Sequence, residues 1–303
     1  MEILPLVKKP FFAFLFLFIA FNSSSFSRQR IPSWRLSLSS FGTYGDYAST
    51  TPSSNFLDKR TSQSFGVYGT FIKGVHSSYS FGTEILSLDE KPLNKNFFSQ
   101  QLYTTRGSWW LGGKWSVAAH GAILHEDDFD YHDVGFVALD SLYSFPATMY
   151  YFIGGGILFH QSQFATASVT GTLSLYENKI YSQLFTAKYS YQIAQGLFNI
   201  SAIDAGKTKS TPLLLSAREQ LTYFYSQFSF NAKVSLGKRV FFFDESLLVL
   251  FNQREQQTVS FGGGVSYFFS PKFSLIGTFE FEKFDSYTIS YTALGLKYNY
   301  VSE

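Results

Sequence analysis

The chain has 303 residues, a formal net charge of +2 and no cysteine; 15% of its residues are charged and 20% are aromatic. Charged residues are scarce beside the roughly 25% usual in soluble domains. The near-neutral balance, with basic residues scattered along the chain, argues against a nucleic-acid-binding surface. The absence of cysteine excludes disulfides, cysteine-ligated metal sites, a cysteine nucleophile and a lipid anchor on an N-terminal cysteine.

The first 27 residues have the features of a secretory signal peptide. Lys8 and Lys9 form a short basic region, Phe11–Phe21 is an unbroken apolar run, and Ser25-Phe26-Ser27 offers a cleavage point before Arg28. Eleven apolar residues rise about 16 Å in a helix, against roughly 30 Å of hydrocarbon, so a membrane-tethering anchor is the less favoured alternative. We therefore expect a signal peptide at 1–27 and one exported domain at 28–303.

No later segment reads as a transmembrane helix. The strongest apolar run, Val240–Phe251, is too short and is interrupted by Asp244 and Glu245. Only helices and closed barrels satisfy their backbone groups in lipid. The exported chain is therefore either soluble or a membrane-spanning β-barrel.

Short alternating runs follow one another along the whole exported domain. The clearest lies at 165–175, where alanine, valine, glycine and leucine alternate with serine and threonine, which is the period-two pattern of a strand. Polar stretches near 45–60, 88–96 and 125–133 indicate loops. The alternation predicts strands at about 34–39, 65–71, 78–85, 97–107, 115–123, 134–143, 148–160, 165–175, 180–192, 196–205, 218–235, 239–252, 257–269 and 273–282, with a last one ending at 300.

These fifteen runs contain a counting error, because bacterial single-chain barrels have even strand numbers. We expect the error near 106–114 or 134–160 and predict an all-β fold: one antiparallel transmembrane β-barrel of about fourteen strands, with twelve to sixteen left open. The alternative is a soluble β-sandwich or a β-rich secreted domain. A sandwich usually closes within about 100 residues, whereas this pattern continues without a linker. Its polar positions are mostly uncharged, which suits a wet interior better than a soluble exterior.

Aromatic residues near strand ends favour a barrel with interfacial girdles. They are Trp109, Trp110, Trp115, Tyr150, Tyr151, Tyr189, Tyr191, Tyr298 and Tyr300. In the last strand Gly295, Tyr298 and Tyr300 have the spacing of a glycine followed by two aromatic residues. This ending resembles the C-terminal signal of Gram-negative outer-membrane β-barrel proteins, although the tail at 301–303 departs from it. The resemblance implies an integral outer-membrane location, lipid contacts and recognition of the last strand by the barrel-assembly machinery.

The predicted function is a passive, porin-like pore for small solutes, because about fourteen strands leave an interior wider than side chains fill. The candidate pore-lining charges are Arg35, Glu84, Lys188, Glu280, Glu282 and Lys297. The alternative is a surface barrel that binds ligands or adheres through its extracellular loops. Oligomeric state is left open.

An enzyme is the less favoured hypothesis, and no cofactor or catalytic residue is assigned. His76-Ser77-Ser78 has the histidine–serine spacing of outer-membrane lipid hydrolases, but it lies beside the predicted turn at Lys73. Asp128, Asp130 and His132 have the composition of an omptin-like protease pair or a weak metal site, yet they share one loop. The run Gly262–Gly264 is followed by no helix, so we expect it to relieve strand curvature or close packing rather than bind phosphate.

Overall fold

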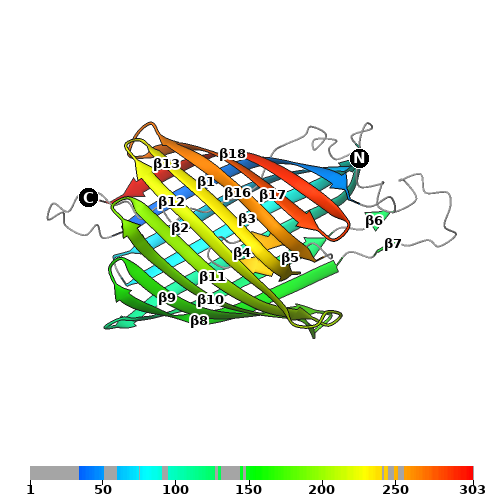
Figure 1. Ribbon diagram of the computed structural model, residues 1–303, viewed down its shortest axis with the longest axis horizontal. Coiled ribbons are helices and arrows are strands. Elements are labelled where there is room, and N and C mark those ends of the chain that lie inside the picture. The colour runs from blue at the N-terminus through cyan, green and yellow to red at the C-terminus, as the bar shows by residue number, and fades with distance from the viewer. Residues whose placement is uncertain are drawn as a thin grey trace, which may run out of the picture.

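The computed structural model describes residues 34–50, 60–74, 76–90, 95–126, 129–130, 144–145, 148–240, 242–244, 249–251 and 256–302. Fourteen strands form a closed antiparallel barrel, in the order β1-β18-β17-β16-β13-β12-β11-β10-β9-β8-β5-β4-β3-β2 (Figure 1). Within the described residues, no helix is long and apolar enough to cross a membrane. The predicted all-β barrel and its strand number are confirmed.

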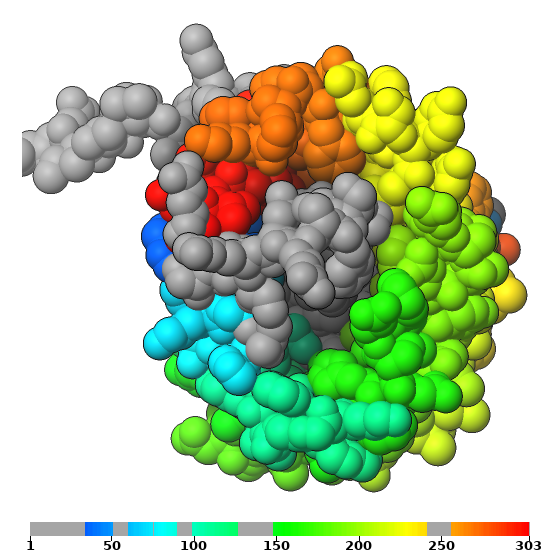
Figure 2. All heavy atoms as spheres, turned by 90° about the vertical axis from the view of Figure 1, so that its left-hand side faces the viewer, coloured from blue at the N-terminus to red at the C-terminus, as the bar shows by residue number. Residues whose placement is uncertain are grey.

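The barrel strands follow the chain in simple up-and-down order. Their bounds are β1 Trp34–Ser49, β2 Arg60–Lys73, β3 Ser77–Glu90, β4 Lys95–Gly112, β5 Trp115–Glu126, β8 Thr148–Ser162, β9 Ala165–Tyr176, β10 Lys179–Ala194, β11 Leu197–Thr208, β12 Leu214–Tyr225, β13 Phe228–Arg239, β16 Gln257–Phe268, β17 Phe273–Phe284 and β18 Tyr287–Val301. The first and last strands close the barrel, with Arg35 opposite Val301 and Ser49 opposite Tyr287. Figure 2 looks at the end that carries the chain's C-terminus and shows the strands following one another around a ring.

Three of the fifteen predicted runs were assigned wrongly, and the errors cancel to fourteen. The run at 218–235 is two strands, because Ser226 and Gln227 form a turn between β12 and β13. The run at 239–252 is not part of the barrel: β13 pairs directly with β16. The run at 134–143 lies outside the described residues, and in the barrel β5 pairs directly with β8. Only this last error falls in a region where we expected one.

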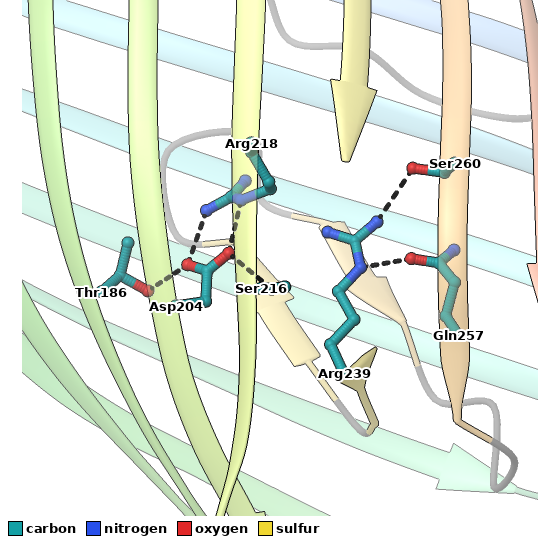
Figure 3. A network of polar contacts seen from close by, with 7 residues as sticks. All are labelled: Thr186, Asp204, Ser216, Arg218, Arg239, Gln257 and Ser260. Carbon is teal, nitrogen blue, oxygen red and sulfur yellow. Dashed lines mark hydrogen bonds and ion pairs between the residues drawn. The ribbon is translucent and has the colours of Figure 1, made fainter. Parts of the chain in front are cut away.

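Two short hairpins lie between barrel strands. β6 (Phe129–Asp130) pairs with β7 (Ser144–Phe145), and β14 (Phe242–Asp244) pairs with β15 (Val249–Phe251). The β14–β15 hairpin is not part of the barrel wall, although Figures 1 and 3 both draw it within the outline of the barrel. In β14 and β15 backbone hydrogen-bonding groups pair with each other within the hairpin, so these residues do not have to join the barrel sheet.

The two ends of the barrel differ in the length of their connections. At the end where β1 begins and β18 finishes, successive strands are joined by two to four residues. At the other end the connections include 50–59, 127–147 and 240–256. Short turns are periplasmic and long loops extracellular in outer-membrane barrels, so the end with the short turns is the periplasmic one.

Alternation along each strand separates an outer apolar face from an inner face. In β9, Val169 and Leu173 are 45% and 40% exposed, whereas Thr170 and Ser174 are buried. The same parity holds in β17, where Phe273 and Leu275 face outward and Ser274 faces inward. A soluble β-sandwich would bury these apolar side chains, so the exposed apolar band is the face that contacts lipid. The alternation predicted from the sequence is confirmed at both strands.

One aromatic residue assigned to the girdles was placed on the wrong face. Tyr150 in β8 points inward, is 7% exposed and stacks on Tyr176 with ring centroids 5.0 Å apart. Tyr151, its neighbour, is the outward one and is 45% exposed. Because the two residues are adjacent in an apolar run, the sequence pattern did not distinguish the faces.

Candidate functional site on the inner face of the barrel

A band of charged and polar side chains occupies the inner face of the barrel from β10 to β17. We call this band the polar wall. It consists of Thr186, Asp204, Ser216, Arg218, Lys233, Arg239, Gln257, Ser260, Glu280 and Glu282. The paired registers place these residues on the same face of consecutive strands, since cross-strand partners point to the same side.

Asp204 and Arg218 form a two-pronged ion pair on β11 and β12 (Figure 3). The Arg218 Nε donates to Asp204 Oδ2 at 2.7 Å, and Nη2 donates to Oδ1 at 3.0 Å. The Thr186 hydroxyl donates to Oδ1 at 2.9 Å, and the Ser216 hydroxyl donates to Oδ2 at 3.4 Å. Asp204 is only 2% exposed. Four donors therefore offset the desolvation of this carboxylate.

Arg239 extends the polar wall at the extracellular end of β13. Its guanidinium donates from Nε to Gln257 Oε1 and from Nη2 to Ser260 Oγ at 3.3 Å, both on β16 (Figure 3). The residue is 7% exposed. These two hydrogen bonds tie Arg239 to β16, between the strands of the Asp204–Arg218 pair and β17 with its carboxylates.

The third charged contact joins two strands that are not neighbours. Lys233 on β13 reaches Glu280 on β17, with Nζ and Oε1 2.5 Å apart. The strand between them, β16, places Gly262 directly opposite both residues. A Cβ on Gly262 would lie 2.5 Å from the carbonyl oxygen of Phe279, so no side chain fits there. The prediction that this glycine run serves close packing is confirmed at Gly262.

The inner face from β1 to β8 carries a buried apolar cluster among serine, threonine and other polar side chains. Its buried cluster, which we call the aromatic wall, consists of Phe41, Tyr68, Leu102, Ala122, Leu124, Tyr150, Phe152 and, from β17, Ile276. Rings lie flat where inward glycines leave space: a Cβ on Gly295 would be 2.2 Å from the Phe41 ring. Tyr68 similarly covers Gly82, where a Cβ would be 2.4 Å from its ring.

The carboxylate of Glu84 lies beside Tyr68 of the aromatic wall. It accepts a hydrogen bond from the Ser64 hydroxyl at 2.6 Å and another from the Tyr68 hydroxyl at 2.9 Å. Glu84 is 6% exposed. The carboxylate is therefore held by these two neutral donors.

Two inward histidines lie between the aromatic and polar walls. The His120 Nε2 is 2.8 Å from the Thr172 hydroxyl, and the ring crosses β8 at Gly154 to reach it. His160 lies 2.8 Å from the Ser116 hydroxyl through Nε2 and 3.2 Å from the Thr166 hydroxyl through Nδ1. These three contacts are all to serine or threonine hydroxyls. In the described residues no three histidine or acidic side chains gather as a metal site.

The candidate pore-lining residues all have inward parity in their strands. Glu280, Glu282 and Glu84 are buried, and Lys297 is 9% exposed. Arg35 and Lys188 share their face with inward neighbours in the registers of β1 and β10. Glu280 contacts Lys233, whereas Glu84 lies beside the aromatic wall. The six residues are therefore distributed around the barrel, and their role in lining a conducting path stays a prediction.

The proposed assembly residues lie in β18 as the pattern predicts. Tyr298 and Tyr300 face outward, and Tyr300 stacks on Trp34 at 4.9 Å. Gly295 faces inward beneath Phe41. Their recognition by the assembly machinery stays a prediction.

The candidates for enzyme and metal chemistry find no support in the described residues. His76 lies at the periplasmic turn and stacks on Trp110 with centroids 5.4 Å apart, far in strand position from Glu84. Ser78 contacts the Ser108 hydroxyl at 2.7 Å. Asp128 and His132 lie outside the described residues, and for Asp130 only the backbone pairing of β6 is described.

Sequence reasoning missed the main charged cluster, Asp204, Arg218, Lys233 and Arg239. A usable signal was present in 214–225, where leucine, alanine and tyrosine alternate with Ser216, Arg218 and Thr222. That parity alone places Arg218 inside. The interior partners on other strands depend on register, which the pattern does not provide.

A closed fourteen-stranded antiparallel barrel with an apolar outer face and a polar and aromatic interior defines an integral outer-membrane β-barrel protein. The outer-membrane location is confirmed by this fold, whereas cleavage of residues 1–27 stays a prediction. No family model matches the chain, and no curated protein matches it in sequence.

Several solved structures share the fold. The TodX monoaromatic hydrocarbon channel, as its deltaS2 mutant, has a TM-score of 0.60 at 8% identity, with 90% of each chain covered. The toluene transporter TbuX of Ralstonia pickettii has a TM-score of 0.56 at 11% identity, and the CymD monoaromatic hydrocarbon channel 0.51 at 12%, again with 90% of each chain covered. The likeness at these identities is one of fold. These neighbours are described as channels or transporters.

Proposed function

We propose that the protein is a passive outer-membrane channel for small solutes with a substantial apolar part. The observation that carries this proposal is the buried aromatic wall on the inner face, together with a polar wall whose charges contact one another. Asp204 pairs with Arg218, and Lys233 pairs with Glu280. Paired charges exert little net attraction on ions of either sign, whereas aromatic faces favour apolar solutes.

The fold neighbours support the same solute class. TodX and CymD are described as monoaromatic hydrocarbon channels, and TbuX as a toluene transporter. A porin-like pore for hydrophilic solutes is the competing function, and the Ser and Thr residues that alternate on the inner face favour it. The two functions differ in which class of solute crosses the membrane faster when the barrel is present.

The test uses the refolded full-length protein in liposomes whose outer leaflet is lipopolysaccharide. This leaflet slows apolar solutes that would cross a phospholipid bilayer unaided. Uptake of toluene and arabinose is measured with and without protein. We expect protein to accelerate toluene more than arabinose. Faster arabinose with unchanged toluene would establish the porin-like function, and acceleration of neither would refute a channel.

A matched pair of substitutions identifies the path. Phe152 is 4% exposed in the aromatic wall, and the next residue, Ile153, is 61% exposed on the outer face. Phe152→Ser should lower toluene uptake, because it removes an apolar ring from the interior. Ile153→Ser makes the same polar replacement on the lipid side and should leave uptake unchanged. Equal effects of the two variants would contradict a path along the aromatic wall.

A further inference from the structure

A hydrogen-bonded polar cluster that includes a carboxylate lies on the outer face of the described strands β11 and β12. Asn199 and Ser201 on β11 and Glu219 on β12 have outward parity, and we call these three residues the outer polar patch. Ser201 lies directly opposite Glu219. Their outward neighbours Ile203 and Leu221 are 62% and 44% exposed, as expected for lipid-facing residues.

The patch is a built cluster of hydrogen bonds. Glu219 Oε2 accepts from the Ser201 hydroxyl at 2.9 Å and from Asn199 Nδ2 at 3.0 Å. Asn199 Nδ2 also donates to Ser201 Oγ at 2.9 Å. The two contacts to Glu219 are therefore both made to its Oε2 atom. Within the described part of the chain, Glu219 Oε1 accepts no hydrogen bond.

Glu219 lies deep in the apolar band. It is four residues from Tyr223 on the periplasmic side of β12, where outward tyrosines mark the interface. At a strand rise of about 3.3 Å and a tilt of about 40°, four residues correspond to roughly 10 Å of depth in a band about 25 Å tall. Ionisable residues at such depth are costly and generally functional.

Other outward charges of the described strands lie close to strand ends. Lys207, Lys238 and Lys283 are each the penultimate residue of their strand, and Asp46 lies three residues before the end of β1. Glu219 is separated from both ends of β12 by five or more residues. Among the described strands, no second outward charge shares its depth.

Small residues lie on one side of the patch, toward β13 and β16, whereas Tyr189 and Tyr191 lie opposite Ser201 and Asn199 on the β10 side. Ala217 precedes Glu219 on the outer face of β12, and Ala232 lies opposite Leu221 on β13. Gly263 follows opposite Ala232 on β16. Small outward residues let another protein surface approach the backbone closely, and polar side chains at such contacts hydrogen-bond across them.

We propose that the outer face of β11–β13 around Glu219 is the interface of a two-fold homodimer in the membrane. A two-fold axis along the membrane normal places the same residues of two copies at the same depth, which brings polar groups to Glu219 where lipid chains offer none. In such an interface, if residue i of one copy contacts residue j of the other, residue j of the first copy also contacts residue i of the second. Glu219 of one copy then lies against Ser201 of the other, and an offset of one strand, about 4.8 Å, separates the two carboxyl groups.

A head-to-tail ring fits the surface less well. It requires a second polar outer patch at the same depth on another side of the barrel. The described strands show no outward charge there. The two-fold arrangement needs the outer polar patch alone.

The first test uses the cysteine-free chain as its background. Leu221→Cys lies beside Glu219 and Leu275→Cys lies on β17, and the two leucines are 44% and 45% exposed. Each full-length variant is expressed in membranes, oxidised, and run on a non-reducing gel. Leu221→Cys should form a disulfide-linked dimer and Leu275→Cys should remain monomeric. Equal crosslinking of the two variants would overturn the proposal.

The second test measures mass by light scattering in mild detergent. The wild type should be a dimer, and Glu219→Leu should raise the dimer dissociation constant by about tenfold or more. Glu219→Gln keeps oxygen and nitrogen groups at the site and should remain largely dimeric. An intact barrel in each variant is verified by the mobility shift on heating. A monomeric wild type, or a Glu219→Leu dimer of unchanged affinity, would refute the assignment. Neither readout depends on solute transport.

Discussion

Asp204→Ala is the substitution for which the structure gives the clearest energetic expectation. It removes a carboxylate that is 2% exposed and leaves Arg218, whose side chain is 19% exposed, without its ion-pair partner. Breaking a buried pair by deleting one member costs about 3–5 kcal/mol, because an uncompensated charge remains. Thr186→Val removes one neutral hydroxyl donor to the same carboxylate and should cost only about 1 kcal/mol.

The assay is urea unfolding of the refolded barrel in detergent micelles, followed by fluorescence of the four tryptophans. We expect the free energy of unfolding to fall by about 3–5 kcal/mol in Asp204→Ala. The double variant Asp204→Leu, Arg218→Met removes both charges while keeping apolar volume, and should recover most of the loss. A single variant within about 1 kcal/mol of wild type, or a double variant no more stable than the single one, would refute the reasoning.

Two further predictions concern close packing and the last strand. Gly262→Ala places a Cβ 2.5 Å from a backbone carbonyl of β17 and should lower the urea midpoint by an amount equivalent to about 1–3 kcal/mol. Gly277→Ala is the control and should be near neutral, because its Cβ would lie 3.7 Å from the nearest atom. Equal effects of the two substitutions would contradict the packing argument. Tyr300→Ala removes the stacking on Trp34 and should reduce the amount of folded barrel in membranes more than Leu294→Ala does. The folded amount is measured as the fraction of protein whose gel mobility shifts on heating. Equal yields of the two variants would argue against an assembly role.

Alternation along single strands was sufficient to predict the fold. In 165–175 every second residue is polar, as is every second residue of 273–282 except Ile276, and the structure places both series inward. The alternation is local, because successive side chains of any strand point to opposite faces. Where the alternation is absent, as in 148–160 and 239–252, the sequence did not show that Tyr150 faces inward or that 239–252 is excluded from the barrel.

The inner site depended on information that no single run contains. Asp204 meets Arg218, and Lys233 meets Glu280 across Gly262, because the hairpin registers and barrel closure bring those positions to one level. For Glu219 the alternation in the sequence already indicates the outer face, because this acidic residue occupies a position in the outward apolar series. The sequence by itself thus determined the barrel, its two faces and its lipid-facing exterior, since these follow from the two-residue period. The pairing of charges, the position of the aromatic wall and the depth of Glu219 were decided by the tertiary structure, since they depend on how distant strands align.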